Sequence, residues 1–246
     1  MVATRTPEQL PAFFAELAAW EERAAVPVET VRYGSHPDQE LDLRRPAGPG
    51  PHPTALVVHG GFWRAGFTRA NTAALAVALT AAGWITANIE YRRLGPGAYR
   101  ELFDDVRAAA RSLGAAVAIG HSAGGHLALW LAADGDAAAA VTLGAVCDLA
   151  AAERAHLGQD AVRELFGNEP YDAYDPARLL PLRVPQVLVH GCHDDRVPIE
   201  HVRDYAELAS AAGDDCRVVE LEDADHFDVI DPRYPGFARI VEAMPR

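Results

Sequence analysis

The sequence is poor in cysteine and in long apolar segments. Its 246 residues include only three cysteines, Cys147, Cys192 and Cys216, which are widely spaced. An odd and scattered set is not the disulfide framework of small secreted proteins, so we expect a reducing, cytoplasmic environment. No apolar run approaches the ~18 residues of a membrane span. The N-terminus also lacks the basic and apolar regions of a secretion signal.

Positive charge is scarce as well. The 22 Lys and Arg residues are outnumbered by 35 Asp and Glu residues, which leaves a formal net charge of −13. An acidic surface repels phosphate backbones and anionic lipids, so nucleic acids and membranes are not expected partners. The negative charge is instead expected to keep the protein soluble.

The composition otherwise suits one globular domain over residues 1–246. Half of the residues are hydrophobic and 23% are charged, values that allow a large buried core. Thr6-Pro7 is typical of a helix start, and that helix should continue to about Ala25. Two short strands are expected near residues 29–33 and 40–44.

From Thr54 onward, apolar strand patterns alternate with helical patterns. This alternation predicts an α/β fold with a mostly parallel central sheet and helices on both faces. Because parallel strands end at one edge of the sheet, residues that follow them should gather there. The predicted strands cover residues 54–59, 84–91, 116–119, 138–146, 185–190 and 216–221, and the helices 71–82, 99–113, 123–133, 199–212 and 237–244.

The alternation is interrupted over residues 149–183, which lack a strand signal. We interpret this segment as a small cap insertion over the edge where the motifs lie. The alternative is a surface excursion that only covers an edge of the sheet.

The sequence G-H-S-A-G at residues 120–124 matches the G-x-S-x-G pattern of a nucleophilic serine. It follows an apolar strand and precedes a leucine-rich helix, which is the context the pattern requires. Ser122 would occupy a strained turn, and Gly120 and Gly124 would remove steric clashes beside it. The alternative is a tight turn whose serine only caps the helix.

A second motif, H-G-G-F-W at residues 59–63, ends an earlier strand. Hydrolysis of an acyl group passes through an oxyanion, which backbone N–H groups can stabilise where the charge develops. We expect these donors to come from Gly60, Gly61 or Phe62 and from Ala123.

Two side chains in these motifs are candidate substrate contacts, Trp63 and His121. Trp63 could line the pocket for the acyl group, or it could be a core aromatic residue. His59 is expected to hold its loop by hydrogen bonds.

The acid and the base of a catalytic triad should follow later strands, in the order Ser, Asp, His. His226, in D-H-F after the last strand, is the predicted base. Asp194, in the turn after the strand at 185–190, is the predicted acid, with Asp195 as its immediate rival and Asp148 as a more distant one. The histidine would take the serine proton while the aspartate holds the other ring nitrogen.

A metal site is the competing interpretation of the same turn. His190, His193 and Asp194 carry ligand atoms, but their spacing is not that of two ligands on one helical turn, and H-E-x-x-H does not occur. We therefore expect neither a metal nor another cofactor.

Together, H-G-G-F-W, G-H-S-A-G-G-H and D-H-F resemble the motifs of kynurenine formamidases and related small esterases. These enzymes belong to the hormone-sensitive-lipase-like branch of the α/β-hydrolase superfamily. The resemblance covers roughly Tyr33 to the C-terminus, and the tryptophan at residue 63 is its most specific part. It implies an α/β-hydrolase fold and the hydrolysis of N-formylkynurenine or of simple aryl and alkyl esters, without a cofactor.

The sequence therefore predicts a serine hydrolase that cleaves a small ester or formamide through an acyl-enzyme. A non-catalytic hydrolase fold that binds a small ligand is one alternative, and a peptidase or acyltransferase with the same triad is another. A homodimer is compatible with the sequence.

Overall fold

The computed structural model describes residues 4–93, 99–114 and 116–245. These residues form an eight-stranded sheet with the strand order β1-β2-β4-β3-β5-β6-β7-β8. β1 and β2 pair in antiparallel fashion, β2 also runs antiparallel to β4, and every pairing from β4 to β8 is parallel. The predicted, mostly parallel sheet is confirmed. Its strands are β1 (Glu29–Arg32), β2 (Glu40–Arg44), β3 (Thr54–Val58), β4 (Ile85–Ile89), β5 (Val117–His121), β6 (Ala139–Leu143), β7 (Gln186–Gly191) and β8 (Cys216–Leu221).

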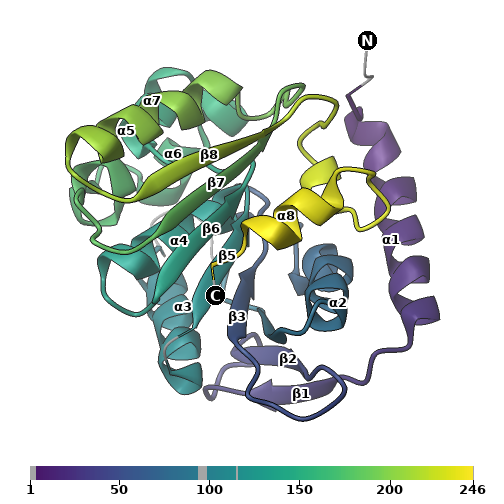
Figure 1. Cartoon of the computed structure of the whole chain (residues 1–246). Coiled ribbons are helices and arrows are strands. Elements are labelled where there is room, and N and C mark those ends of the chain that lie inside the picture. Colours follow the sequence, from purple (N-terminus) through teal and green to yellow (C-terminus); the bar gives the residue numbers. More distant parts are fainter. Residues whose placement is uncertain (1–3, 94–98, 115, 246) are drawn as a thin grey trace.

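Helices cover both faces of this sheet, as predicted (Figure 1). Side chains alternate along each strand, so Ala55 and Val57 of β3 enter one core cluster, while Leu56 and Val58 enter the other. α1, α2 and α8 pack on the first face, and α3, α4 and α7 on the second. The helices are α1 (Leu10–Ala24), α2 (Ala73–Ala81), α3 (Tyr99–Leu113), α4 (Ala123–Ala133), α5 (Leu149–Arg154), α6 (Leu157–Phe166), α7 (Ile199–Ala211) and α8 (Phe237–Ala243).

The N-terminal helix begins where the sequence predicts it. The Thr6 N–H donates to the Gln9 side chain at 2.9 Å, and a short 3₁₀ turn at Pro7–Gln9 leads into α1. The helix buries Phe13 and Leu17, and each such side chain contributes about 2 kcal/mol. α1 thus lies against α2 and the C-terminal part of the chain (Figure 1).

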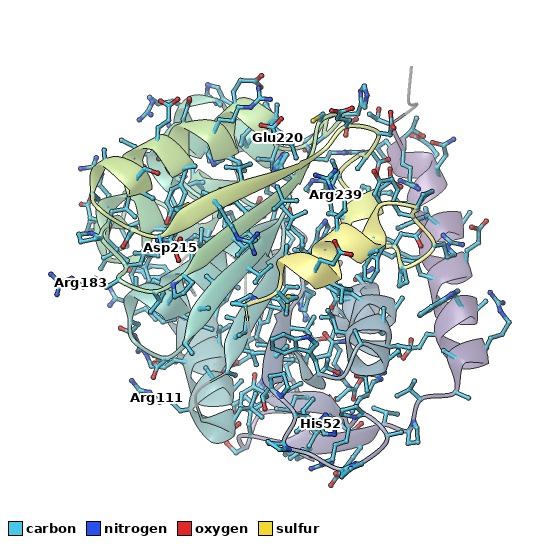
Figure 2. All side chains as sticks on the ribbon, viewed as in Figure 1. His52, Arg111, Arg183, Asp215, Glu220 and Arg239 are labelled. Atoms are coloured by element: carbon cyan, nitrogen blue, oxygen red, sulfur yellow. The ribbon has the colours of Figure 1, made fainter. Side chains whose placement is uncertain are left out.

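Several charged side chains lie at the periphery. Arg111 and Arg183 project outward (Figure 2). Glu220 lies on the edge strand β8 and pairs with Arg203 at 2.7 Å, and charges on an edge strand disfavour pairing with another sheet. No helix in the described part of the chain combines the length and hydropathy needed to cross a bilayer.

The segment at residues 149–183 forms α5, α6 and two 3₁₀ turns, Asp172–Tyr174 and Pro176–Arg178. Two side chains of α4 hold it. His126 Nε2 donates to the Tyr174 carbonyl at 2.8 Å, and Trp130 Nε1 donates to the Ala173 carbonyl at 3.2 Å. The segment is therefore tied to the helix that follows Ser122.

The fully buried His126 should make folding sensitive to acid. Burial lowers the pKa of His126 from 6.5 to about 4. Between pH 6.5 and about pH 4, His126 is protonated in the unfolded chain but neutral in the folded chain. The free energy of unfolding therefore decreases as the pH drops below 6.5. In His126→Gln, the decrease in unfolding free energy from pH 6 to pH 4.5 should be smaller by about 1 kcal/mol per pH unit. Urea titrations at several pH values measure how the unfolding free energy changes with pH. If the variant and the wild type showed the same pH dependence, the lowered pKa of His126 would be contradicted.

Candidate active site

Ser122 occupies a sharp turn between β5 and α4. β5 ends at His121 and α4 begins at Ala123, which leaves one residue to reverse the chain. Ser122 has φ 54° and ψ −120°, a region that costs an L-residue about 1–3 kcal/mol. Its N–H donates to the Leu143 carbonyl at 2.9 Å, so the neighbouring strand β6 holds the turn in place.

Glycines allow this turn because backbone atoms pass very close to them. A Cβ at Gly120 would lie 2.0 Å from the Gly124 carbonyl oxygen, and one at Gly124 would lie 2.2 Å from the Val58 carbonyl oxygen. Any larger residue would push β5, α4 and β3 apart. The glycines predicted to make room for the turn are therefore required by packing.

His226 follows β8 and is oriented by the carboxylate of Asp194. The His226 Nδ1–Asp194 Oδ2 distance is 2.6 Å, and both side chains are almost completely buried. Because the carboxylate accepts the Nδ1 proton, Nε2 of a neutral His226 is left as a base. Ser122 and His226 both line one pocket. The structure thus brings together the three residues that the sequence nominated.

Several groups hold the Asp194 carboxylate in the ionised form. Its Oδ1 accepts the N–H groups of Arg196 at 2.9 Å and Val197 at 2.8 Å, and its Oδ2 also lies 3.3 Å from His190 Nε2. Burial alone would raise the pKa of Asp194, but His226, His190 and the Val197 N–H outweigh it and lower the pKa. An ionised carboxylate can hold the ring of His226 and stabilise its protonated form.

The rival carboxylates have other contacts. Asp195 has a side chain that is 43% exposed and pairs with Arg196 Nε at 3.2 Å. Asp148 caps α5, where its side chain accepts the Ala151 N–H at 2.7 Å. Among the described residues, no group of three or more His, Cys, Asp or Glu residues could hold a metal ion.

His121 braces the loop that carries His226. Its Nε2 donates to the His226 carbonyl at 2.9 Å. Burial, followed by the nearby His226, lowers the pKa of His121 to about 3, so its ring is neutral and carries its proton on Nε2. The side chain also lines the pocket, which is where a substrate contact would have to be.

The H-G-G-F-W loop runs beside the serine with an unusual backbone. Gly61, Phe62 and Trp63 all have positive φ, of 111°, 49° and 61°. A Cβ at Gly60 would lie 2.8 Å from Ser122 Cβ, so this stretch of backbone passes directly against the serine. Gly60, Gly61 and Phe62 line the pocket.

Ala123 adds a further N–H at the same place. As the first residue of α4, it belongs to the turn whose N–H groups lack an intrahelical partner. Of the four residues nominated as oxyanion donors, three line the pocket with Ser122, namely Gly60, Gly61 and Phe62, and the fourth, Ala123, follows Ser122 directly in the chain.

Trp63 does not line the pocket. Its side chain is 2% exposed within the core and meets the His126 ring edge-on, with the ring centroids 5.3 Å apart. Of the two aromatic residues in this motif, Phe62 is the one that lines the pocket. The structure thus places Trp63 as a core residue, which was the alternative interpretation.

His59 contributes to the support of the loop. The ring is buried, its Nδ1 donates to the Gly60 carbonyl at 2.9 Å, and it stacks on Tyr91 with the centroids 4.4 Å apart. Its Nε2 lies 2.9 Å from Glu90 Oε1. Burial lowers the pKa of His59 to about 3, so His59 is a structural residue, as expected.

The pocket over Ser122 has a volume of about 430 Å³ and a partly apolar wall that sequence reasoning missed. Three residues of this wall, Pro7, Leu10 and Phe14, come from the N-terminal segment. That segment precedes the first strand, so the alternation of strands and helices does not determine where it lies. The only available signal was the aromatic pair Phe13-Phe14 in an otherwise amphipathic helix. Phe67, Arg64 and Arg196 also line the pocket and were missed.

The segment at 149–183 reaches the same pocket through Gly158 and Gln159 at the start of α6. Arg64 ties it to the H-G-G-F-W loop. The Arg64 Nη2 donates to the Gly158 carbonyl at 2.8 Å, and Nε donates to Glu164 at 2.7 Å. Within the segment at 149–183, only the start of α6 lines the pocket.

The chain resembles a known protein family and known folds. A family model described as BD-FAE matches residues 41–168, which is just over half of the chain. No curated protein matches the sequence.

Among solved structures, similar ones are forms of esterase 2 from Thermogutta terrifontis. The form phosphoramylated by tabun and the propionate-bound form are each 24% identical, with a TM-score of 0.70. The butyrate-bound form is 25% identical, with a TM-score of 0.69. Each comparison covers 87% of this chain and 91% of the other. The predicted α/β-hydrolase fold is thereby confirmed.

The strain at Ser122 can be measured as stability. Glycine adopts positive φ without a steric penalty, whereas alanine does not. Ser122→Gly should therefore unfold with a free energy about 1 kcal/mol higher than Ser122→Ala, even though glycine makes the unfolded chain more flexible. Urea unfolding of the two variants gives the difference. An alanine variant at least as stable as the glycine variant would show that the turn is not strained.

Proposed function

This chain belongs to the BD-FAE family, and we propose that it is a serine hydrolase that cleaves small carboxylic esters or aryl formamides through an acyl-enzyme. One observation carries the proposal. Ser122, at a strained strand–helix turn, shares a pocket with His226, whose Nδ1 lies 2.6 Å from the buried Asp194 carboxylate. A histidine that a buried carboxylate holds beside a serine is the combination that serine hydrolases use to activate the hydroxyl.

In the first step, Ser122 Oγ attacks the carbonyl carbon while His226 Nε2 takes the serine proton. The charge on the carbonyl oxygen is stabilised by backbone N–H groups from Gly61 or Phe62 and from Ala123. Asp194 stabilises the protonated His226. The histidine then donates its proton to the leaving alcohol or amine, and the acyl group stays on Ser122.

In the second step, a water molecule replaces the leaving group. His226 takes a proton from the water, which attacks the acyl carbon, and the same N–H groups stabilise the second oxyanion. Collapse of this intermediate returns the proton to Ser122 and releases the acid. No step requires a group other than the three side chains, the backbone donors and water.

Two features favour a short acyl group. The pocket of about 430 Å³ is bounded by Phe14, Phe62, Phe67 and Phe227, which favours a small apolar substrate over an extended chain. The Thermogutta esterase has been observed with propionate and with butyrate. We propose short-chain esters as the first substrate class, with aryl formamides as the second because of the motifs shared with kynurenine formamidases.

Turnover of p-nitrophenyl acetate, p-nitrophenyl butyrate and N-formylkynurenine tests this function, with Ser122→Ala as the blank. We expect the wild type to hydrolyse the short esters and the variant to lose at least about a thousandfold in kcat. A strong preference for the formamide would assign the second class. If none of the three were turned over, the non-catalytic ligand-binding alternative would replace the proposal, and retained ester turnover in Ser122→Ala would refute the nucleophile.

Adjacent carboxylates give a matched test of the acid. Asp194→Asn removes the negative charge that orients and stabilises protonated His226, so kcat should fall about 10³- to 10⁴-fold. Asp195→Asn makes the same chemical change one residue away, at a pocket-lining side chain that pairs with Arg196, and should change kcat by less than about tenfold. Steady-state kinetics with p-nitrophenyl acetate compares them. Equal losses in the two variants, or a larger loss in Asp195→Asn, would contradict the assignment of Asp194.

A further inference from the structure

The loop that carries His226 is built around two carboxylates. Asp225 Oδ1 accepts the N–H groups of Phe227 at 2.8 Å and Asp228 at 3.0 Å. In return, Asp228 Oδ2 accepts the Asp225 N–H at 2.9 Å. The backbone on both sides of His226 is therefore fixed by side chains three residues apart, and both carboxylates are largely removed from water.

Arg5 supplies the positive charge that these two carboxylates need. Its Nη1 donates to Asp225 Oδ1 at 2.6 Å, and its Nη2 donates to Asp228 Oδ1 at 2.8 Å. Burial disfavours the charged guanidinium, but the hydrogen bonds and charges of Asp228 and Asp225 outweigh burial and raise the pKa of Arg5. One planar side chain thus bridges the acids on both sides of His226, a geometry that arginine fits better than lysine.

Arg5 also connects the base to the loop of the acid. Its carbonyl accepts a hydrogen bond from Arg196 Nη2 at 3.0 Å, and the Arg196 N–H donates to Asp194. The Arg5 guanidinium lies 4.4 Å from the centre of the Phe13 ring, and Phe13 lies in turn against Phe227, with the ring centroids 5.9 Å apart. The N-terminal segment therefore meets both loops that carry the acid and the base.

We propose that Arg5 is a positioning residue for His226, so that the N-terminal segment is part of the catalytic apparatus. This inference rests on the proposed function. Two carboxylates that brace one short loop repel each other, and without the arginine they would have to separate or exchange partners with water. Movement of the loop would displace His226 from Ser122, and a displacement of about 1 Å can reduce turnover by roughly 100-fold.

Arg233 provides a matched control. It is also a partly exposed arginine that ties α1 to the C-terminal part of the chain, through Glu16 at 2.9 Å and Asp231 at 2.8 Å. Its guanidinium lies over the same Phe13 ring, 5.9 Å from the centroid. Among the described residues, its hydrogen bonds and ion pairs go to Glu16 and Asp231, and none joins it to Asp225 or Asp228. Loss of Arg233 therefore loosens the same helix without releasing the two carboxylates beside His226.

The experiment compares Arg5→Ala, Arg5→Lys and Arg233→Ala in the full chain. The readouts are kcat and KM for p-nitrophenyl acetate, Tm, and hydrogen exchange of the amides at residues 225, 227 and 228. We expect Arg5→Ala to lower kcat about tenfold or more, with KM within about twofold, and to speed exchange of these amides. Arg5→Lys should recover part of kcat because it keeps the charge. Arg233→Ala should lower Tm to a similar degree and leave kcat within about twofold.

The inference is overturned if Arg5→Ala changes kcat no more than Arg233→Ala does, or if only KM rises. If Arg5→Ala does not fold, Arg5→Lys provides the test. A kcat equal to that of the wild type in this variant overturns the proposal, whereas a reduced kcat with an unchanged KM supports it. A wild type that hydrolyses no ester refutes the proposed function instead. In that case hydrogen exchange alone tests whether Arg5 holds the loop. Unchanged protection of the amides at residues 225–228 in Arg5→Ala would contradict this role.

Discussion

The reversal of the chain at Ser122 is the constraint on which the rest of the site depends. Strand β5 ends one residue before the serine and helix α4 begins one residue after it, so the backbone takes a conformation that is unfavourable for an L-residue. This unfavourable conformation is maintained because β3 and β6 pack against the turn from two sides. The Leu143 carbonyl accepts the Ser122 N–H, and the backbone of β3 lies where a Cβ of Gly124 would be. The sheet thereby aims the hydroxyl into the pocket.

The electrostatics of the site follow from the same edge of the sheet. His121, Asp194 and His226 lie at or just after the ends of strands β5, β7 and β8, and all three are buried. Burial keeps His121 neutral, whereas hydrogen bonds and the nearby histidines keep Asp194 ionised. In general, an ionised carboxylate that holds one ring nitrogen of a histidine leaves the other nitrogen able to accept a proton from serine and to return it. The protonation states of His121 and Asp194 thus depend on neighbouring hydrogen-bonding and charged groups as well as on burial.

Most of the fold and the positions of the motifs were predictable because they depend on local patterns. Alternating strand and helix signals fix the order of a parallel sheet, and residues after parallel strands must meet at one edge. Asp194 and Asp195 could not be distinguished in the same way, since adjacent residues in a turn differ only in where their side chains point. Whether Phe62 or Trp63 lines the pocket could not be predicted for a similar reason, because the answer depends on three successive positive φ angles at residues 61–63. The contribution of Pro7, Leu10 and Phe14 depends on the packing of α1, which no local pattern records.

The central claim is that Ser122 is a nucleophile activated by His226. The most direct measurement is the mass of the protein after treatment with a fluorophosphonate, followed by mapping of the modified peptide. We expect one adduct per chain, located on Ser122, and much slower labelling in a His226→Ala variant. An adduct on another residue, or equally fast labelling without His226, would contradict it.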